Sequence, residues 1–436
     1  MNATKANYYR ATATAYGGFA PLAQARSARV TIIGGGYAGL NTALGLAERG
    51  VEDVVLLESE TIGHGASGRN GGFVFAGYSL GESALLHKLG VERAKALFLS
   101  TVAAVQLIRS RIARYHIPCA AVDEGVIWAN WFRDPEVLRR RQRFLAENFG
   151  VQWDWLPRES LRELLHSARY GDALCERNAL HLHPLNYAIG IAQAAVTQGV
   201  SIHERSPATR ITRHGEGWRI QTDNGVLDSE HVVLACGGYL AGLDARVDRS
   251  ILPIATYVMV TQPLGARLRE CVNTRAAVYD TRFAFDYYRA LPDSRLLWGG
   301  RISVRDRSPD QVRGLLYRDL LRVYPQLDGI DVEYAWSGLM SYARHQMPQI
   351  GQREKGLWYA QAFGGHGVAP TAVAGELIAA AIAKDDAAWR TFAAFGLDSA
   401  WRPAGFAAAQ ANYWWYQMLD ATRGWMEGRG VKRKTR

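Results

Sequence analysis

Apolar positions along the first sixty residues follow a strand–helix–strand pattern. A β-prone run at 30–33 leads into a glycine-rich turn, and apolar residues then recur at helical spacing from 40 to 47. A second apolar run at 54–57 ends in the acidic Glu58. This order predicts a βαβ unit in which the glycine-rich turn joins the first strand to the helix.

The glycines of this turn have the spacing G-x-G-x-x-G. In dinucleotide-binding units the first glycine allows a tight turn, the second lets the pyrophosphate approach the backbone, and the third lets helix and strand pack closely. The helix N-terminus attracts the phosphates. Glu58 follows Gly39 by 19 residues, where its carboxylate can accept hydrogen bonds from the ribose hydroxyls and would repel the extra phosphate of NADP. NAD and FAD both remain open. The predicted contacts are Gly34, Gly36, Tyr37, Ala38, Gly39, Glu58 and Ser59.

A second glycine-rich stretch follows, with six glycines among the nineteen residues 61–79. Small residues at this density indicate backbone that passes close to something flat or phosphorylated, although a flexible surface loop would have the same composition. An NAD-binding domain has no need of such a loop here, whereas an FAD site must thread the ribityl chain and the flavin ring. The predicted contacts are Gly65, Ala66, Ser67, Arg69, Asn70, Gly71 and Gly72.

The middle of the chain alternates between helical and strand patterns. Helical spacing covers 82–116, 135–150 and 184–199, and Ser160 opens another helix. Short strands are predicted at 125–129, 201–204, 208–213 and 218–222, and a hydrophobic strand at 231–236 ends in small residues that can face the cofactor. This region adds Ala208, Thr209, Ala235, Cys236 and Gly237 to the predicted cofactor contacts.

A third glycine turn precedes a small-residue helix that runs to about residue 383. Reduction of a flavin places negative charge on one edge of its ring, and a helix N-terminus aimed at that edge stabilises the charge. An NAD enzyme needs only one such helix start, so the pair of them favours FAD. The predicted contacts are Gly364, Gly365, His366, Gly367 and Val368.

These elements predict an α/β protein, with a Rossmann-like FAD-binding domain interleaved with an α+β substrate domain under a mixed or antiparallel sheet. Residues 1–27 form a lead-in that packs its aromatic side chains on a neighbour. The FAD-binding domain comprises 28–120, 184–250 and 331–384, and the substrate domain comprises 121–183 and 251–330. Residues 385–436 form a helical extension with a basic tail.

Composition supports a globular protein and excludes several classes. The 436 residues are 48% hydrophobic and 21% charged, and no apolar run reaches the ~20 residues that a membrane span needs. Four cysteines lack metal-binding spacing, and no metal site is predicted. With no secretory signal, we expect a cytoplasmic protein. The net charge of +10 includes the tail residues Lys432, Arg433, Lys434 and Arg436; such runs are usually solvated, but attraction of an anionic substrate or of RNA stays open.

Aromatic and arginine residues of the strand-rich region 251–301 are the candidates for the substrate site. Tyr257, Tyr287, Tyr288 and Trp298 can wall a cavity, although core packing would explain each equally well. Arg289, Arg301 or Arg344 can hold a carboxylate through a bidentate pair, with a structural salt bridge as the alternative role. The predicted catalytic set is Tyr287, Arg289, Trp298, Arg301 and His366.

Several of these motifs together resemble the D-amino-acid-oxidase superfamily of flavoproteins, and within it the γ-glutamylputrescine oxidases. The similarity covers most of the chain and includes GGGYAGL, IGHGASGRNGG, HLHPLN, DYYRALPDSRLLWGG, MPQIG and GGHGV. It implies noncovalent FAD and oxidation of a small amine, which can carry a carboxylate, by molecular oxygen. The products would be an aldehyde, ammonia or an amine, and hydrogen peroxide.

The chain departs from that family at two positions. Arg301 stands where the family keeps a third glycine, and Gln346 stands where it has arginine, which puts the substrate in doubt. Residues 341–351 contain no cysteine for a covalent flavin link, and His64 is the odd candidate for a histidyl link. Two other functions stay open: a dehydrogenase that reduces a quinone, and a flavin-dependent RNA-modifying protein. The second is disfavoured because no RNA-binding module is recognisable, so no nucleic-acid partner is expected.

Overall fold

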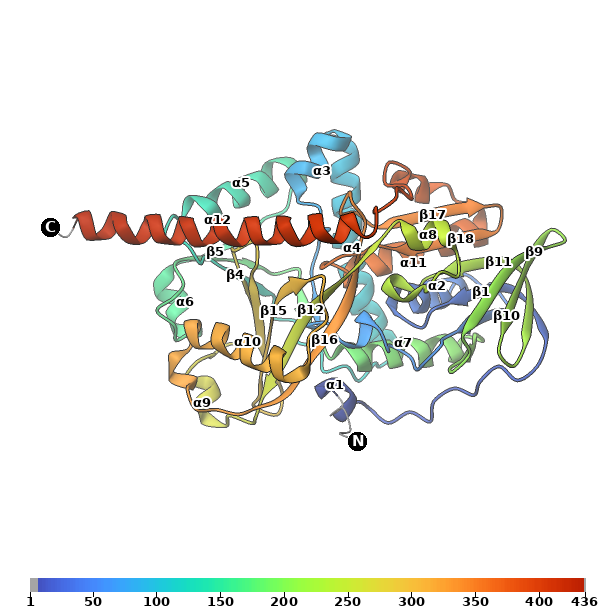
Figure 1. Ribbon diagram of the computed structural model, residues 1–436, viewed down its shortest axis with the longest axis horizontal. Coiled ribbons are helices and arrows are strands. Elements are labelled where there is room, and N and C mark those ends of the chain that lie inside the picture. Colours follow the sequence, from blue (N-terminus) through green and yellow to red (C-terminus); the bar gives the residue numbers. More distant parts are fainter. Residues whose placement is uncertain (1–6, 435–436) are drawn as a thin grey trace.

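The computed structural model describes residues 7–434, and for 425 and 428–434 the backbone only. Two large sheets lie side by side, and helices cover their outer faces (Figure 1). Part of the lead-in (1–6), part of the basic tail (435–436) and the side chains of Lys432, Arg433 and Lys434 lie outside the described residues. The predicted α/β architecture of two interleaved sheet domains is confirmed.

The first sheet is the nucleotide-binding sheet, in the order β17-β18-β11-β1-β2-β8, with β10 and β9 continuing from β11. Its central strands are parallel, and β2 and the C-terminal ends of β1 and β11 are apolar and buried, because α2, α7 and α11 cover the sheet. The strands are β1 (Arg26–Ile33), β2 (Val54–Leu57), β8 (Ser201–His203), β9 (Ala208–His214), β10 (Gly217–Thr222), β11 (Val226–Leu234), β17 (Gln349–Glu354) and β18 (Leu357–Gln361); the helices are α2 (Tyr37–Ala47), α4 (Val91–Arg114), α7 (Pro184–Thr197) and α11 (Val368–Lys384).

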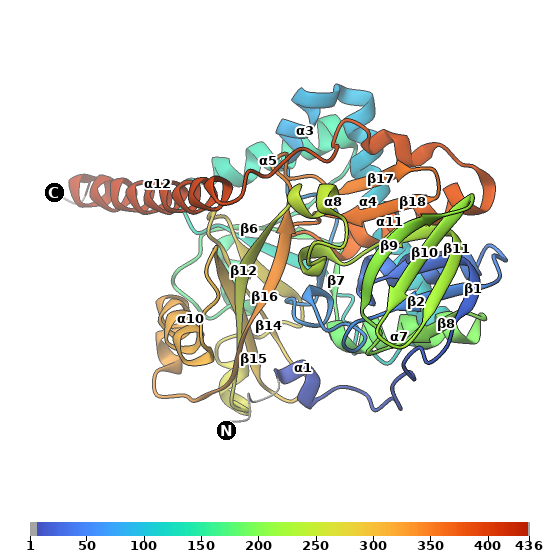
Figure 2. The same cartoon turned by 45° about the vertical axis from the view of Figure 1, so that its right-hand side comes forward.

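The second sheet, in the order β16-β12-β15-β14-β13-β4-β6-β5, is antiparallel except where β13 runs parallel to β4. Helix α10 covers one of its faces, as Figure 2 shows from a second side. The strands are β4 (Val126–Ala129), β5 (Asp154–Leu156), β6 (Ala173–Glu176), β12 (Leu252–Thr261), β13 (Ala277–Asp280), β14 (Asp286–Ala290), β15 (Leu296–Ser303) and β16 (Val332–Tyr342); α10 is Pro309–Val323.

Smaller elements connect the sheets or lie at their edges. Strand β3, which follows the glycine loop, pairs with β7. Helix α12 is the long C-terminal helix that crosses the front of the second sheet and extends beyond it (Figure 1). These elements are α1 (Tyr8–Ala11), β3 (Phe73–Val74), α3 (Glu82–Leu89), α5 (Glu136–Phe149), α6 (Arg158–Leu164), β7 (Leu180–His181), α8 (Ala245–Arg249), α9 (Ala266–Arg269) and α12 (Ala404–Lys434).

The structure changes two details of the predicted layout. Residues 332–342, assigned from the sequence to the FAD-binding domain, form β16 and pair along β12 in the second sheet. The helical stretch 82–116 is two helices, because Gly90 adopts a φ of +78° that ends α3. Among residues 7–434 one helix, α4, is long and apolar enough to cross a membrane, and it packs within the protein against α3, α5 and α11.

Candidate functional site

One continuous cavity of about 1110 Å³ runs between the two sheets. Its lining comes from the start of α2, the glycine loop, the ends of β2 and β11, the start of α11, strands β12, β15 and β16, and the first turns of α12. Ligand pockets usually have volumes of ~300–1000 Å³, so this cavity has room for a large cofactor together with a substrate.

The turn between β1 and α2 is built so tightly that only glycine fits. A Cβ atom on Gly39 would lie 2.0 Å from the carbonyl oxygen of Gly34, and Gly34 itself has a φ of +116° and lies against Ala235. Gly36 caps α2 without any side-chain hydrogen bond, so helix N–H groups stay available to an anion. These features match the requirements of a pyrophosphate.

Glu58 lies at the end of β2 with its carboxylate almost fully buried at the cavity wall. Its Oε2 accepts the N–H of Gly35 at 2.7 Å, and its Oε1 accepts the N–H of Glu60 at 2.9 Å. Burial raises the pKa of Glu58, and these two N–H groups act in the opposite direction. The carboxylate is thus held rigidly where a ribose would lie in a dinucleotide site.

The glycine loop is braced by its own polar side chains. Ser67 Oγ accepts the N–H of Tyr37, and the Asn70 amide donates to the carbonyls of Ala66 and Ser67 while it accepts the N–H of Gly72. Asn70 therefore shapes the loop through both ends of its amide. The space at this loop also depends on glycine, because a Cβ on Gly71 would lie 2.5 Å from the ring of Tyr287.

The start of α11 reaches the cavity from the other side. Gly364 has a φ of +59°, and the N–H of Gly365 donates to Ser79 Oγ at 3.0 Å. The His366 ring packs edge-on against Phe75 at 4.7 Å between centroids, and burial lowers the pKa of His366 to about 4. His366 is therefore neutral at physiological pH, and the positive end of the α11 dipole supplies the favourable potential for negative charge.

Five aromatic side chains form a closed series of contacts along the substrate half of the cavity. Consecutive ring centroids lie 5.5–6.2 Å apart all the way round, and all five rings line the cavity. We call this set the aromatic cluster; its members are Phe73, Phe75, Tyr279, Phe285 and Tyr287. Only Tyr287 of these was predicted from the sequence. The spacing of Phe73 and Phe75, two residues apart after the glycine loop, is the signal that would have found two of the others.

Three aromatic candidates lie on the opposite face of the second sheet and not in the cavity. Trp298 is fully buried and stacks on Tyr288 at 4.5 Å, in the apolar core beneath α10. Tyr257 is buried in the same core. The reason is strand alternation, since a two-residue period places neighbours on opposite faces. The prediction of Trp298 as a catalytic residue is therefore wrong.

Arg289 is also a structural residue. Its side chain is buried and donates to the carbonyls of Gly71 at 2.8 Å and Leu182 at 3.0 Å, and to the hydroxyl of Tyr9 at 3.2 Å. These bonds join the glycine loop, the residue that follows β7 and the N-terminal lead-in. A guanidinium with this many partners is not free to bind a substrate carboxylate, so the structure corrects its predicted catalytic role.

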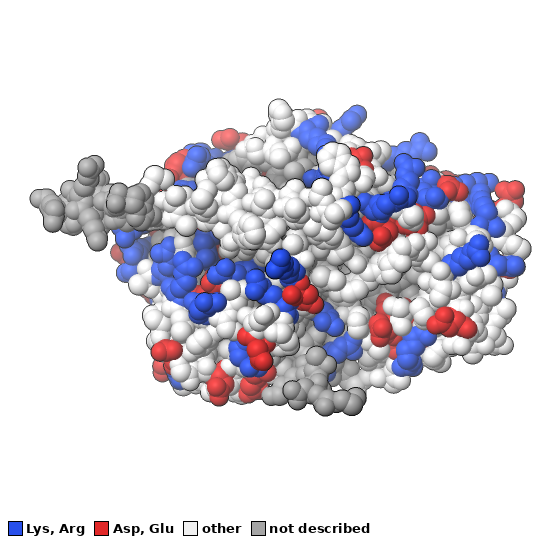
Figure 3. All heavy atoms as spheres, viewed as in Figure 1, with Lys and Arg blue, Asp and Glu red and all other residues white. Residues whose placement is uncertain are grey.

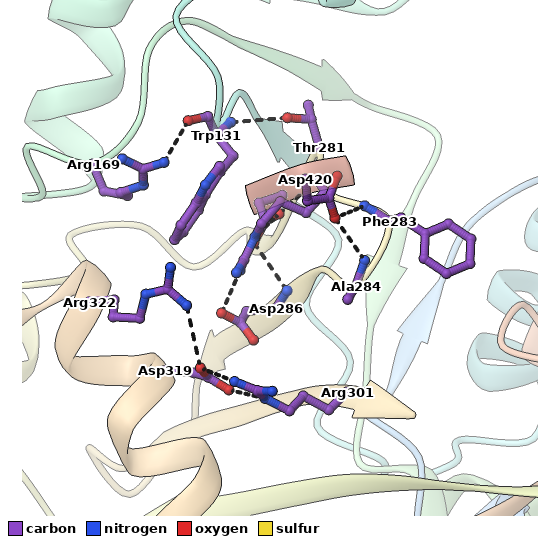
Figure 4. Close-up of polar contacts among 12 residues, drawn as sticks. Trp131, Arg169, Thr281, Phe283, Ala284, Asp286, Arg301, Asp319, Arg322 and Asp420 are labelled. Atoms are coloured by element: carbon purple, nitrogen blue, oxygen red, sulfur yellow. Dashed lines mark hydrogen bonds and ion pairs between the residues drawn. The ribbon is translucent and has the colours of Figure 1, made fainter. Parts of the chain in front are cut away.

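Arg301 lines the cavity, but its guanidinium is already paired. β15 has a bulge at this point, since Tyr257 pairs with Gly300 and Thr256 with Ile302, and Arg301 adopts a φ of +56°. Its Nε and one terminal nitrogen donate to the two carboxylate oxygens of buried Asp319 at 2.6 and 2.7 Å (Figure 4). A left-handed backbone is the conformation that glycine adopts most readily, so the departure at Arg301 falls where the chain has a special backbone requirement.

Two cavity arginines, Arg69 and Arg344, form no ion pair with another described residue. Arg69 donates to the carbonyls of His64 and Ser337, which leaves Arg344 as the one without a hydrogen bond to a described residue. Arg344 is exposed at the cavity mouth, where its guanidinium lies 4.2 Å from the ring centre of Trp401. Gln346 lies beside it with a φ of +57°. The segment from Ala400 into α12 closes this mouth, a role that the predicted surface extension did not include.

Most predicted cofactor contacts lie along the cavity, with three exceptions. Gly39 shapes the turn from behind, Gly72 packs against Leu182, and Thr209 is exposed with its hydroxyl donating to the Gln221 carbonyl. The residues that line the cavity as predicted are Gly34, Gly36, Tyr37, Ala38, Glu58, Ser59, Gly65, Ala66, Ser67, Arg69, Asn70, Gly71, Ala208, Ala235, Cys236, Gly237, Gly364, Gly365, His366, Gly367 and Val368.

Comparison with known proteins places this geometry in a family. The family model described as FAD dependent oxidoreductase (DAO) matches residues 29–381. Gamma-glutamylputrescine oxidoreductase of Escherichia coli (strain K12) is 34% identical over 395 residues, covering 90% of this chain and 92% of that protein.

Two solved structures share the fold. Glycine oxidase from Geobacillus kaustophilus superposes with a TM-score of 0.70 at 23% identity, over 85% of this chain and 98% of that one. L-proline dehydrogenase from P. horikoshii gives the same TM-score at 18% identity, over 84% and 96%. The glycine turns, Glu58 and the cavity size fit a noncovalently bound FAD. The chain therefore belongs to the FAD dependent oxidoreductase family, and it is an FAD enzyme that acts on the C–N bonds of amines or amino acids.

Proposed function

We propose that the protein oxidises a C–N bond of a γ-glutamylated polyamine or a similar amine that carries a carboxylate, with molecular oxygen as the final acceptor. When bound, FAD supplies the two-electron acceptor for a hydride from the carbon next to nitrogen; the imine is hydrolysed to an aldehyde and ammonia or an amine, and oxygen leaves as hydrogen peroxide. This activity would serve polyamine catabolism in the cytoplasm. The similarity to gamma-glutamylputrescine oxidoreductase supports the substrate class.

The observation that carries the proposal is the division of the cavity into an apolar chamber and a cationic mouth. The aromatic cluster surrounds the half of the cavity next to His366 and the glycine loop. Among the described lining residues, the only carboxylates are Glu58 and Glu60, and both belong to the nucleotide end. An ammonium ion that entered the chamber would lose its hydration shell, and no carboxylate of the described chamber lining would compensate its charge. The chamber therefore favours the neutral amine, which is the form that reacts.

The cavity mouth offers a binding group for the carboxylate of such a substrate. Arg344 carries a charge that no described acid neutralises, and it lies at the opening where the far end of an extended amine would rest. A guanidinium at this place can bind a carboxylate in a bidentate pair. Arg301 is less suited to this role because Asp319 occupies its fork.

An anaerobic titration of the purified holoenzyme tests the proposal. We expect γ-glutamylputrescine to bleach the flavin absorbance, and putrescine, glycine and proline to bleach it more slowly by at least tenfold. The rate of bleaching should rise with pH only until the chamber-bound amine is neutral. Faster bleaching by glycine or proline would contradict the substrate class.

A second measurement addresses the electron acceptor. A glycine oxidase and an L-proline dehydrogenase share this fold equally well, so the fold alone does not decide between oxygen and another acceptor. Under air, we expect one hydrogen peroxide for each amine consumed. Turnover that requires a quinone analogue and consumes no oxygen would instead make the protein a dehydrogenase.

A further inference from the structure

The outer face of α12 carries a contiguous apolar stripe. Large apolar side chains recur along one side of the helix and are 42–63% exposed, which is unusual for two tryptophans so close together. We call this set the tryptophan stripe; it consists of Trp414, Trp415, Met418, Leu419 and Met426. No described part of the chain covers the stripe, so it is a surface available to a partner.

The opposite face of α12 is firmly attached to the body of the protein. The hydroxyl of Tyr413 accepts the N–H of Ile302 at 3.2 Å, and the ring of Tyr416 stacks on Phe283 at 4.2 Å. The Asp420 carboxylate accepts the N–H of Phe283 at 3.0 Å, a contact drawn in Figure 4. The stripe is thus presented outward by a helix whose inner face has its own partners.

Positive charge accompanies the stripe. The C-terminal half of α12 lies beside a group of arginines, visible as the blue area directly below that half of the helix in Figure 3. Arg423 pairs with Asp134 and Glu427, but Arg169 forms no ion pair with a described residue and stacks on Trp131 at 3.7 Å. Beyond Glu427 the sequence adds five basic residues and no acid: Arg429, Lys432, Arg433, Lys434 and Arg436.

These features together match one kind of partner. Tryptophan, methionine and leucine on one face with basic residues beside and after them is the pattern of a helix that lies in the interface of a bilayer. Each basic residue near an anionic surface contributes attraction of ~1 kcal/mol. A second copy of this chain is disfavoured as the partner, because each copy carries a net charge of +10.

We propose that α12 attaches the protein to an anionic membrane surface. The tryptophan stripe enters the interfacial layer, the basic residues approach the lipid phosphates, and the helix lies parallel to the bilayer without crossing it. The inner face of the same helix lines the cavity mouth through Gln410 and Tyr413, so attachment brings the active-site opening close to the membrane. This attachment does not depend on which amine is oxidised.

Co-sedimentation of the holoenzyme with vesicles tests the attachment. One set of vesicles contains phosphatidylcholine only, and the other contains phosphatidylcholine mixed with the anionic lipid phosphatidylglycerol, whose surface attracts basic residues. We expect binding to the anionic vesicles, a blue shift of tryptophan emission, and a weakening of at least tenfold in high salt. No binding to anionic vesicles would overturn the proposal.

Two variants separate the contributions, and a third serves as control. W414Q/W415Q should lower the partition coefficient about tenfold and remove most of the emission shift, and K432Q/R433Q/K434Q should lower binding to anionic vesicles by a similar factor. Val196→Gln removes an exposed apolar side chain of α7, which is 40% exposed, and should change nothing. Wild-type flavin content verifies each fold. Unchanged binding in both multiple variants would refute the proposal, as would a dimer in sedimentation equilibrium that W414Q/W415Q dissolves.

Discussion

The two ends of the cavity are built in different ways. At the nucleotide end, the shape comes from the backbone: Gly34 and Gly39 touch neighbouring main chain, and Glu58 is fixed by two main-chain N–H groups. At the substrate end, the shape comes from side chains. Some of these side chains are hydrogen-bonded within the protein, and others are available to a substrate. Arg289 is fully occupied by the protein, whereas Arg344 stacks on Trp401 at the cavity mouth.

This difference decides how a substitution acts at each end. At the nucleotide end, where the backbone forms the site, one added side-chain atom is expected to abolish ligand binding. A side-chain-built site separates into residues that hold the protein together and residues that meet the substrate, and these roles can be measured independently. Substitutions at the two ends of the cavity test that separation.

Gly39→Ala should abolish FAD binding. The added methyl group would lie 2.0 Å from the Gly34 carbonyl oxygen, so α2 and β1 must separate at the cost of on the order of 4 kcal/mol. Gly314→Ala is the matched control, because Gly314 is also inside a helix, is exposed and has no atom within 4 Å of the added Cβ. The control should be neutral or more stable by up to ~1 kcal/mol. Flavin content and thermal unfolding measure both variants. A yellow, stable Gly39→Ala protein would contradict the backbone account.

Arg289→Met should destabilise the protein by about 3 kcal/mol, since it leaves the buried carbonyls of Gly71 and Leu182 without a donor. The matched control is Arg177→Met, which removes an exposed ion pair with Asp154 and should cost less than ~1 kcal/mol. Urea unfolding of the holoenzymes gives both values. If Arg289→Met kept its stability but lost affinity for the substrate, the residue would belong to the binding site after all.

Glu176→Gln should stabilise the protein increasingly as the pH rises. Burial raises the pKa of Glu176 to about 8; its only described partner is the N–H of Ala76 at 3.4 Å, and Oε2 has none among the described residues. Because the pKa of Glu176 is higher in the folded than in the unfolded protein, the contribution of its protonated carboxyl to the free energy of unfolding is fully present below the unfolded-state pKa. This contribution is lost as the pH rises through about 8. The advantage of the glutamine variant should therefore grow between pH 5 and pH 8, by at most ~1.4 kcal/mol per pH unit.

The corresponding change at the nucleotide end, Glu58→Gln, gives the contrast. Glu58 accepts two N–H groups that Glu176 lacks, so the amide should weaken FAD retention at every pH instead of stabilising the protein at high pH. Thermal unfolding from pH 5 to pH 9 distinguishes the two glutamates. Parallel curves for Glu176→Gln and the wild type would show that the buried carboxyl is not protonated.

The sequence predicted the backbone-built half of the molecule well. Glycine spacing carries the information there, because a close approach excludes every other residue, and the first βαβ unit and α11 followed from it. The sequence could not tell Tyr287 from Trp298 in the same way. Both are aromatic residues of the neighbouring strands β14 and β15, and the bulge at Arg301, which interrupts the regular alternation of β15, is visible only in the pairing with β12.

The roles of the arginines were also difficult to predict from the sequence. Arg289 and Arg344 were both candidates for a carboxylate-binding arginine. The partners of Arg289 lie far from it along the chain, at residues 9, 71 and 182, so the sequence around Arg289 does not reveal them. The departure at Arg301 did carry information. Arg301, the departure from the resembled family, has a φ of +56°, and Asp319 holds its side chain in place.

Arg344→Gln should raise KM for a carboxylate-bearing amine about tenfold, a loss of roughly 1.4 kcal/mol in binding, and should leave the midpoint of thermal unfolding unchanged. The reason is that Arg344 is exposed and, among the described residues, stacks on Trp401 without an ion pair. A substrate whose carboxylate is replaced by an amide provides the control, since its KM should be the same for both enzymes. Equal losses for the acid and the amide would assign Arg344 to the shape of the mouth and not to charge recognition.

Thr209→Ala should have the smallest effect, even though the sequence placed Thr209 beside the cofactor. Its hydroxyl donates across to the Gln221 carbonyl of β10, and the side chain is exposed, so FAD affinity should stay within about twofold of the wild type and stability within ~0.5 kcal/mol. The preceding residue gives the contrast, because Ala208 lines the cavity and Ala208→Leu fills part of it. FAD titration of the reconstituted proteins compares the two. If Thr209→Ala lost FAD while Ala208→Leu kept it, strand β9 would face the cavity in the opposite sense, and the nucleotide end would depend on side chains as the substrate end does.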